Sequence, residues 1–178
     1  MSSAIERQTV SPPSATHGER DLDFLAGGGE MGALIRALDW SQTPVGPVGG
    51  WSSTLRTTVR FLLANRFPLL LWWGPEYVQI YNDPYRPIPG TKHPQSLGQP
   101  ARECWPEIWH ILQPLIDTPF LGGPATWMED IFLEPNRRGF LEETHFTIAY
   151  QPGSRRHHPR WNRRRVGHRA RNHGQSCW

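Results

Sequence analysis

Residues 73–88 read WGPEYVQIYNDPYRPI, and the elements of the fold can be placed outward from this stretch. Gly74-Pro75 marks a turn between two short runs, LLLWW at 69–73 and YVQIYN at 77–82. Both runs are rich in residues that favour strands, so we expect an antiparallel hairpin. Five prolines follow within residues 83–104, and they exclude a long regular element there, although one-turn helices fit.

Apolar residues at helical spacing predict two helices upstream of the hairpin. The first runs from about residue 30 to residue 40, and the second begins after a cap at Ser52 or Ser53. Residues 41–50, SQTPVGPVGG, form a turn-rich connection between these helices. The apolar stripe of the second helix consists of Leu55, Val59, Leu62 and Leu63.

Downstream of the proline-rich segment, a third helix is predicted to start at Trp105, with Pro106 in its first turn and a kink or early end at Pro114. Two strands follow, around residues 125–133 and 142–150. The order of helices and strands predicts an α+β domain with an antiparallel sheet, of which four strands are in view. Alternation in the last strand places on one side Thr144, Phe146, Ile148 and Tyr150.

Length and charge divide the chain into a body and a tail. A chain of 178 residues suits one domain with its own core. Residues 1–152 hold 11 Lys and Arg against 16 Asp and Glu, a net charge of −5, whereas residues 153–178 carry eight arginines and no acidic residue. We expect residues 1–20, which are polar and rich in Ser and Pro, to be disordered, and the folded domain to span 21–152.

Features of secreted or membrane proteins are absent from the sequence. The two cysteines, Cys104 and Cys177, are far apart and form no disulfide framework or metal motif, which fits a reducing cytosol. No signal peptide is seen at the N-terminus. The longest apolar run, FPLLLWW at 67–73, is too short to span a bilayer. We therefore predict a soluble cytoplasmic protein with no membrane contact.

Three segments of the chain resemble a PAS domain of the type found at the N-termini of bacterial sensor histidine kinases. They are residues 23–88, which contain the stretch quoted above, KHPQSLGQPARECWPEIW at 92–109 and EETHFTIAY at 142–150. The resemblance covers the chain from about Asp21 to Tyr150. It implies a five-stranded antiparallel sheet with flanking helices, and a sensory role in two-component signalling that is coupled through a C-terminal linker helix to an effector kinase domain.

The tail as written cannot supply the fifth strand that this resemblance implies. Three successive arginines, residues 163–165, would place charge on the core face of a strand. Read one base later, codons for the segment Asn-Arg-Arg-Arg-Val-Gly-His-Arg at 162–169 can encode Ile-Gly-Gly-Val-Leu-Ala-Thr-Val, which is typical of a strand. We hypothesise a single-base frameshift near Gly153, real or from a sequencing error, that removed the last strand and the linker. The nucleotide sequence tests this, because stops or no strand-like peptide in the other frame would contradict it.

The basic tail also leaves a competing class of function open. An Arg-rich segment with Trp161 would bind DNA or RNA without sequence preference, through phosphate contacts and stacking. Salt-dependent retention on nucleic acid that vanishes on truncation at Pro152 would favour this alternative. The four tail histidines lack the spacing of a metal site.

Aromatic residues are abundant enough to line a cavity between the sheet and the helices, which is the usual ligand position in PAS domains. Such a cavity would bind a small molecule that the sequence does not identify, and a homodimer through the same domain is a further expectation. Asn82 ends the second strand, where its role in similar domains is usually structural. The candidate pocket residues are Trp72, Tyr81, Asn82, Tyr85, Trp105, Trp109, Trp127 and Phe146.

Cofactor and catalytic motifs are incomplete. Cys104 lies in Glu-Cys-Trp-Pro-Glu, which does not match the flavin-photosensor motif, and His110 alone leaves haem as a minor alternative, so we expect neither cofactor. GGGEMG at 27–32 satisfies G-x-G-x-x-G but lacks a preceding strand and a following acidic residue, so it indicates the glycine-rich start of a helix. No nucleophile elbow, paired carboxylates or Walker loop is present, and no kinase catalytic domain fits, so we predict no enzyme activity.

Overall fold

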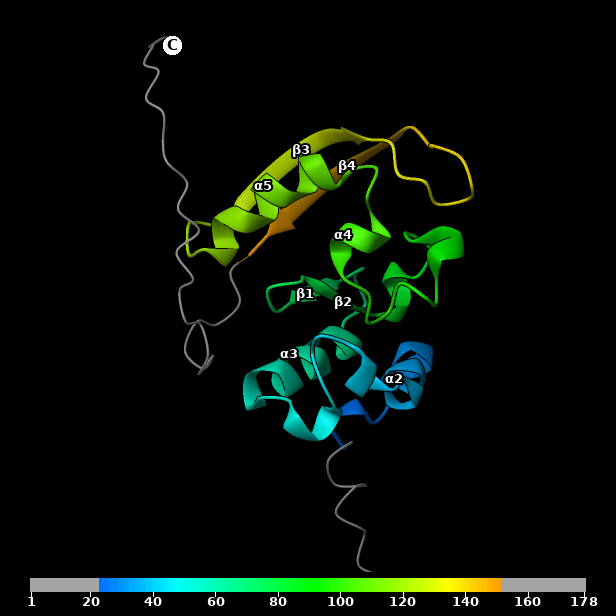
Figure 1. Ribbon diagram of the computed structural model, residues 1–178, viewed down its shortest axis with the longest axis vertical. Coiled ribbons are helices and arrows are strands. Elements are labelled where there is room, and N and C mark those ends of the chain that lie inside the picture. The colour runs from blue at the N-terminus through cyan, green and yellow to red at the C-terminus, as the bar shows by residue number, and fades with distance from the viewer. Residues whose placement is uncertain (1–22, 152–178) are drawn as a thin grey trace, which may run out of the picture.

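The computed structural model describes residues 23–151. The predictions of a disordered segment at 1–20, and of a frameshifted or nucleic-acid-binding tail at 153–178, lie outside the described residues. The described part combines helices with two small antiparallel sheets (Figure 1). The predicted mixture of helix and antiparallel sheet is confirmed.

Two helices, α2 (Gly29–Ala37) and α3 (Ser53–Ala64), lie together at one end of the described structure (Figure 1). Helix α3 begins where the sequence predicts, since the Ser52 hydroxyl accepts a hydrogen bond from the Leu55 N–H at 3.2 Å. Its buried side chains are Leu55, Val59 and Leu62, as the apolar stripe indicates.

Helix α2 ends at Ala37, earlier than the prediction of residue 40. The backbone becomes extended at Leu38, and the Asp39 carboxylate accepts from the Ser41 N–H, which starts a separate 3-10 helix at Trp40–Gln42. The Trp40 indole donates to the Ile35 carbonyl at 2.7 Å, so Trp40 folds back against α2 instead of extending it.

The predicted hairpin is confirmed as strands β1 (Leu70–Trp73) and β2 (Val78–Tyr81), paired antiparallel. The second edge of β2 is covered by residues 98–101. The Gln79 N–H donates to the Gln99 carbonyl at 3.0 Å, and the Ala101 N–H donates to the Tyr77 carbonyl at 3.1 Å. Strand β2 is therefore bonded on both edges, and all four of its residues are buried.

The third predicted helix is α5 (Trp109–Phe120), so the predicted start at Trp105 is wrong. The one-turn helix α4 (Ala101–Cys104) precedes it, in the proline-rich segment where one-turn helices fit. The Trp105 indole donates to the Gln79 side chain at 2.7 Å, which holds the residues between the helices in a turn. Helix α5 also continues past Pro114, where an early end was one expectation. Pro114 is exposed, so the carbonyl that loses its partner lies on the solvent side.

Strands β3 (Thr126–Leu133) and β4 (Thr144–Tyr150) form the second hairpin. Strand β4 alternates between half-buried and exposed residues as predicted. Strand β3 has an irregularity between Met128 and Ile131, where Asp130 takes a φ of 53°. Within residues 23–151 the two hairpins do not pair with each other, so the expected four-stranded sheet is two two-stranded sheets.

The buried side chains form two hydrophobic clusters. The first lies between α2, α3 and β2, and contains Met31, Val59 and Ile80. The second lies between α5 and β3, and contains Leu112 and Leu133. Strand β2 and the residue before it connect the clusters, because Ile80 belongs to the first and Tyr77 to the second. Among residues 23–151, none of the helices is long and apolar enough to cross a bilayer.

Candidate ligand-binding site

A cavity of about 690 Å³ lies between the two hairpins and the start of α5. Leu70 of β1 and Ile148 of β4 line two of its walls, and Leu112 of α5 lines a third. Among the described residues, the lining side chains are aromatic or aliphatic, with Arg137, Thr147 and two tyrosines as the main polar ones, and none is acidic. The cavity therefore suits a molecule that is largely apolar.

Five of the eight predicted pocket residues line this cavity. They come from β1, the 3-10 helix Asp83–Tyr85, the turn before α5, β3 and β4, so the fold brings together segments that are far apart in the sequence. These five residues are Trp72, Tyr85, Trp105, Trp127 and Phe146.

Tyr81 and Trp109 lie outside the cavity lining. Tyr81 is 1% exposed and packs in the first cluster, with its hydroxyl 2.8 Å from Ser96 Oγ and 2.9 Å from His93 Nδ1. Trp109 is the first residue of α5, and its ring packs against Tyr77 with the centroids 5.7 Å apart. Both residues pack against other parts of the protein and cannot contact a molecule in the cavity.

Asn82 is also absent from the cavity lining, and its contacts are structural. Its side-chain amide donates to the carbonyls of Leu62 (3.1 Å), Asn65 (3.2 Å) and Phe67 (2.8 Å). Its Oδ1 accepts from the Leu69 N–H at 2.9 Å. Asn82 thus joins the C-terminal end of α3 to the start of β1, from a fully buried position.

Asp83 acts as a cap, but for a helix distant in sequence. Its carboxylate accepts from the Glu30 N–H at 3.2 Å and from the Met31 N–H at 2.7 Å, in the first turn of α2. The carboxylate thus serves a helix 52 positions upstream, and not the 3-10 helix Asp83–Tyr85 that it begins. The close approach requires Gly29, because a Cβ there would lie 1.9 Å from Asp83 Oδ2.

The polar groups around the cavity are neutral or already paired. Burial raises the pKa of Tyr85 and of Tyr150, so both hydroxyls stay protonated at neutral pH. The indoles of Trp72 and Trp105 both direct their N–H groups to the Gln79 side chain, at 3.4 and 2.7 Å. The faces of the rings are thus the surfaces left to a ligand. The rings of Trp72 and Tyr150 also meet, with centroids 5.2 Å apart, and connect β1 to β4.

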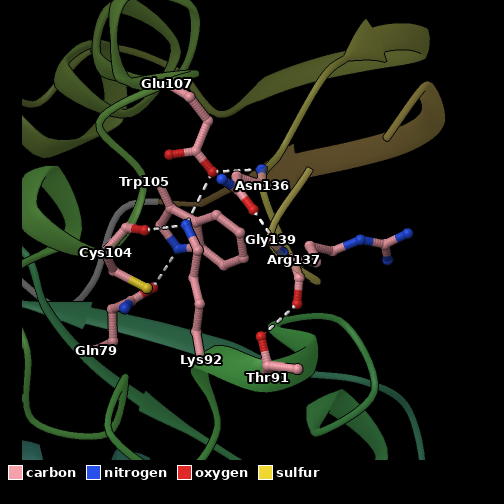
Figure 2. Close-up of polar contacts among 9 residues, drawn as sticks. All are labelled: Gln79, Thr91, Lys92, Cys104, Trp105, Glu107, Asn136, Arg137 and Gly139. Atoms are coloured by element: carbon pink, nitrogen blue, oxygen red, sulfur yellow. Dashed lines mark hydrogen bonds and ion pairs between the residues drawn. The ribbon is translucent and has the colours of Figure 1, made fainter. Parts of the chain in front are cut away.

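A half-buried ion pair supports the Trp105 wall of the cavity (Figure 2). Lys92 Nζ donates to Glu107 Oε1 at 2.8 Å and to the Cys104 carbonyl, and it lies 4.5 Å from the centroid of the Trp105 ring. The same Glu107 oxygen accepts from the Asn136 N–H at 2.6 Å. Sequence reasoning missed Lys92 and Glu107, because no spacing rule pairs two charges across an irregular, proline-rich segment.

The Lys92–Glu107 pair makes stability depend on pH in a predictable direction. Burial would raise the pKa of Glu107, but the hydrogen bonds from Lys92 and from the Asn136 N–H outweigh it and lower this pKa below its ordinary value of 4.5. Because the pKa is lower in the folded state, the stabilisation is complete above pH 4.5 and is lost as the pH falls through the folded-state value.

We expect Glu107→Gln to lower the free energy of unfolding by about 2 kcal/mol at pH 7, because it leaves Lys92 partly buried without its counter-charge. The difference from the unsubstituted protein should shrink as the pH falls below 4.5. Urea unfolding at pH 7, 5, 4 and 3 measures it, with the exposed Glu134→Gln as the matched control. A difference that stays constant over this range would contradict the assignment.

No protein-family model matches the chain, and no curated protein matches it. Within residues 23–151, no group of three His, Cys, Asp or Glu side chains is placed to hold a metal ion. Cys104 is buried at 2% exposure, and burial raises the pKa of its thiol. His110 is exposed on α5.

Proposed function

We propose that residues 23–151 form a PAS-type sensory module of a cytoplasmic signalling protein, which binds a small molecule and has no catalytic activity of its own. The observation that carries this proposal is the partly open cavity of about 690 Å³ between two antiparallel hairpins and α5. Its volume lies within the range of roughly 300–1,000 Å³ typical of small-molecule sites. The order of the elements, from helices to hairpin, short helices, longer helix and hairpin, also supports the resemblance seen in the sequence.

The chemistry of the lining indicates an uncharged, largely apolar ligand. Arg137 is the one cationic side chain among the described lining residues, and its guanidinium already pairs with Glu142 Oε2 at 2.7 Å. The hydroxyls of Tyr85 and Tyr150 can each donate or accept one hydrogen bond without carrying charge. An aromatic or aliphatic molecule with one or two neutral polar groups therefore matches the site.

A ligand in this cavity is positioned to change how the two hairpins lie relative to each other. Trp72 and Tyr150 connect β1 and β4 at the cavity, and Tyr150 is the last residue of β4. A molecule that binds one arrangement of the hairpins better than another shifts the population toward it. We propose that this shift, passed on from the end of β4, is the signal.

Filling the cavity should abolish binding without unfolding the protein. Ile148 lines the cavity from β4 and is half-buried, so Ile148→Trp places a larger ring in the space that the ligand needs. We expect at least tenfold weaker binding of whichever compound binds the unsubstituted chain, in a panel of uncharged compounds that includes indole, naphthol and decanol. Isothermal titration calorimetry measures the affinity.

The control for this experiment is Phe61→Trp, on the exposed side of α3, where Phe61 is 64% exposed. This variant adds an indole of the same size away from the cavity and should bind as the unsubstituted chain does. The proposal is wrong if no compound of the panel binds, or if Ile148→Trp and Phe61→Trp bind with the same affinity.

A further inference from the structure

Strand β4 presents an edge, and not only a face, to the cavity, and β1 lies beside the cavity. The lining residues include the consecutive run 146–150 of β4, whereas β1 contributes the alternate residues Leu70 and Trp72. Successive side chains of a strand point to opposite faces of its sheet. The consecutive run therefore means that the cavity meets β4 edge-on, where the backbone N–H and C=O groups project. The unpaired edge of β1 follows from its backbone bonds.

The bonding pattern of β2 shows which backbone groups of β1 point away from β2. Tyr77 and Gln79 bond residues 98–101, so the intervening Val78 and Ile80 direct their backbone groups toward β1. The Asn82 N–H, next in this series, donates to the Leu69 carbonyl at 3.2 Å.

The partners of Val78 and Ile80 in β1 are Trp73 and Leu71. Leu70 and Trp72 alternate with them, and so their backbone groups point away from β2. Within residues 23–151, β1 has β2 as its only strand neighbour. The edge formed by Leu70 and Trp72 thus has no strand partner among the described residues, and both residues also line the cavity.

The composition of the lining restricts what can lie between the two edges. Backbone donors and acceptors on both sides call for an occupant with its own donors and acceptors on both sides, which is an extended peptide. The lining is apolar, includes the cation Arg137 and contains no acidic residue, so charged side chains on the peptide would be costly to bury. Residues 153–178, with eight arginines and no acidic residue, do not meet this requirement.

We propose that the cavity is a strand-acceptor site. Between the edges of β1 and β4 it takes one extended peptide from another chain, with uncharged, mainly β-branched or small side chains, and the inserted strand joins the two sheets. The inference rests on the proposed function, because it concerns the same cavity, and it adds a second class of occupant. The side chains of the peptide need not have one fixed size, because backbone hydrogen bonds hold the peptide in place. The apolar lining selects among side chains by their charge.

The sequence itself suggests a probe and its matched control. The peptide Ile-Gly-Gly-Val-Leu-Ala-Thr-Val, the shifted reading of residues 162–169, is uncharged apart from its termini, which are blocked for the experiment. The control peptide Asn-Arg-Arg-Arg-Val-Gly-His-Arg is the same segment as written. A second control is the first peptide with every second backbone nitrogen methylated, which keeps the side chains and removes the donors of one edge.

Amide hydrogen exchange of the full chain, followed by NMR, tests the proposal. With the first peptide bound, we expect exchange at Leu70 and Trp72 to slow at least tenfold, and exchange at Leu71 and Trp73, which already face β2, to stay unchanged. Both control peptides should bind at least tenfold more weakly. The proposal is overturned if Leu70 and Trp72 are not protected, or if either control peptide binds as well as the first.

The outcomes separate this inference from the proposed function. Small molecules that bind where the peptide does not would overturn the strand-acceptor site and leave the sensory function in place. Peptide binding with no small-molecule binding would support the acceptor site and overturn the proposed ligand class. Protection of Leu70 and Trp72 before any peptide is added would mean that the chain's own residues fill the site, which also overturns the proposal.

Discussion

Asn82→Ala is expected to lower the free energy of unfolding by about 3 kcal/mol, because it removes four hydrogen bonds to buried or half-buried backbone groups. Alanine cannot replace either the donors to the three carbonyls or the acceptor for the Leu69 N–H. The junction between α3 and β1 would lose the side-chain hydrogen bonds that hold it to Asn82, the residue after β2. Urea unfolding monitored by circular dichroism measures the change.

Two further variants separate the role of this amide from a general effect of substitution. Asn82→Asp keeps the size of the side chain but places an oxygen against three carbonyl oxygens, so it should destabilise at least as much as Asn82→Ala. Asn65→Ala removes one exposed bond, from the Phe67 N–H, and should cost less than about 1 kcal/mol. Equal losses for Asn82→Ala and Asn65→Ala would show that the hydrogen bonds of Asn82 stabilise the protein no more than one exposed bond does.

Gly29→Ala is the second substitution with a large expected effect, about 3 kcal/mol, from a left-handed backbone and a lost helix cap. Gly29 has a φ of +62°, and an added Cβ would lie 1.9 Å from Asp83 Oδ2. The Asp83 carboxylate would have to move away from the first turn of α2, whose Glu30 and Met31 N–H groups it now accepts from. The loss should appear as a lower urea midpoint and a lower Tm.

A matched glycine and a double-mutant cycle test the cause of this loss. Gly46 also has a positive φ, +77°, but nothing lies within 4 Å of an added Cβ, so Gly46→Ala should cost only about 1 kcal/mol. In an Asp83→Ala background the clash with Gly29→Ala disappears, and its cost should fall to that of Gly46→Ala. If the losses of stability from Gly29→Ala and Asp83→Ala are additive in the double variant, the contact between residue 29 and Asp83 does not cause the loss.

Local patterns were sufficient to predict those elements whose bonds are local. The cap and stripe of α3 lie within one helix, and the hairpin of β1 and β2 depends on one tight turn. The alternation of β4 predicts that Phe146 and Ile148 share one side of the strand, and both line the cavity. Five of the eight predicted pocket residues could be found because large aromatic side chains in short strands and turns collect where the two hairpins meet.

Contacts between distant segments were not predictable from one sequence. Trp105 stays out of α5 because Gln79, 26 positions away, accepts its indole N–H, and no periodicity reports such a bond. Asp83 caps α2 across 52 positions, and the Lys92–Glu107 pair joins two irregular segments. The separation of the hairpins into two sheets depends in the same way on which strand edges find a partner, and the sequence of one strand does not determine that.

The central claim is that the cavity between β1 and β4 is where a ligand binds, and indole N–H signals test it directly. Trp72, Trp105 and Trp127 line the cavity, whereas Trp40 and Trp51 lie in the first cluster with their N–H groups bonded to the Ile35 and Gly46 carbonyls.

In a two-dimensional NMR titration of the full chain with a compound of the panel, we predict shifts of the indole signals of Trp72, Trp105 and Trp127, with those of Trp40 and Trp51 unchanged. Shifts confined to Trp40 and Trp51, or equal shifts of all five, would contradict the claim that this cavity is the binding site.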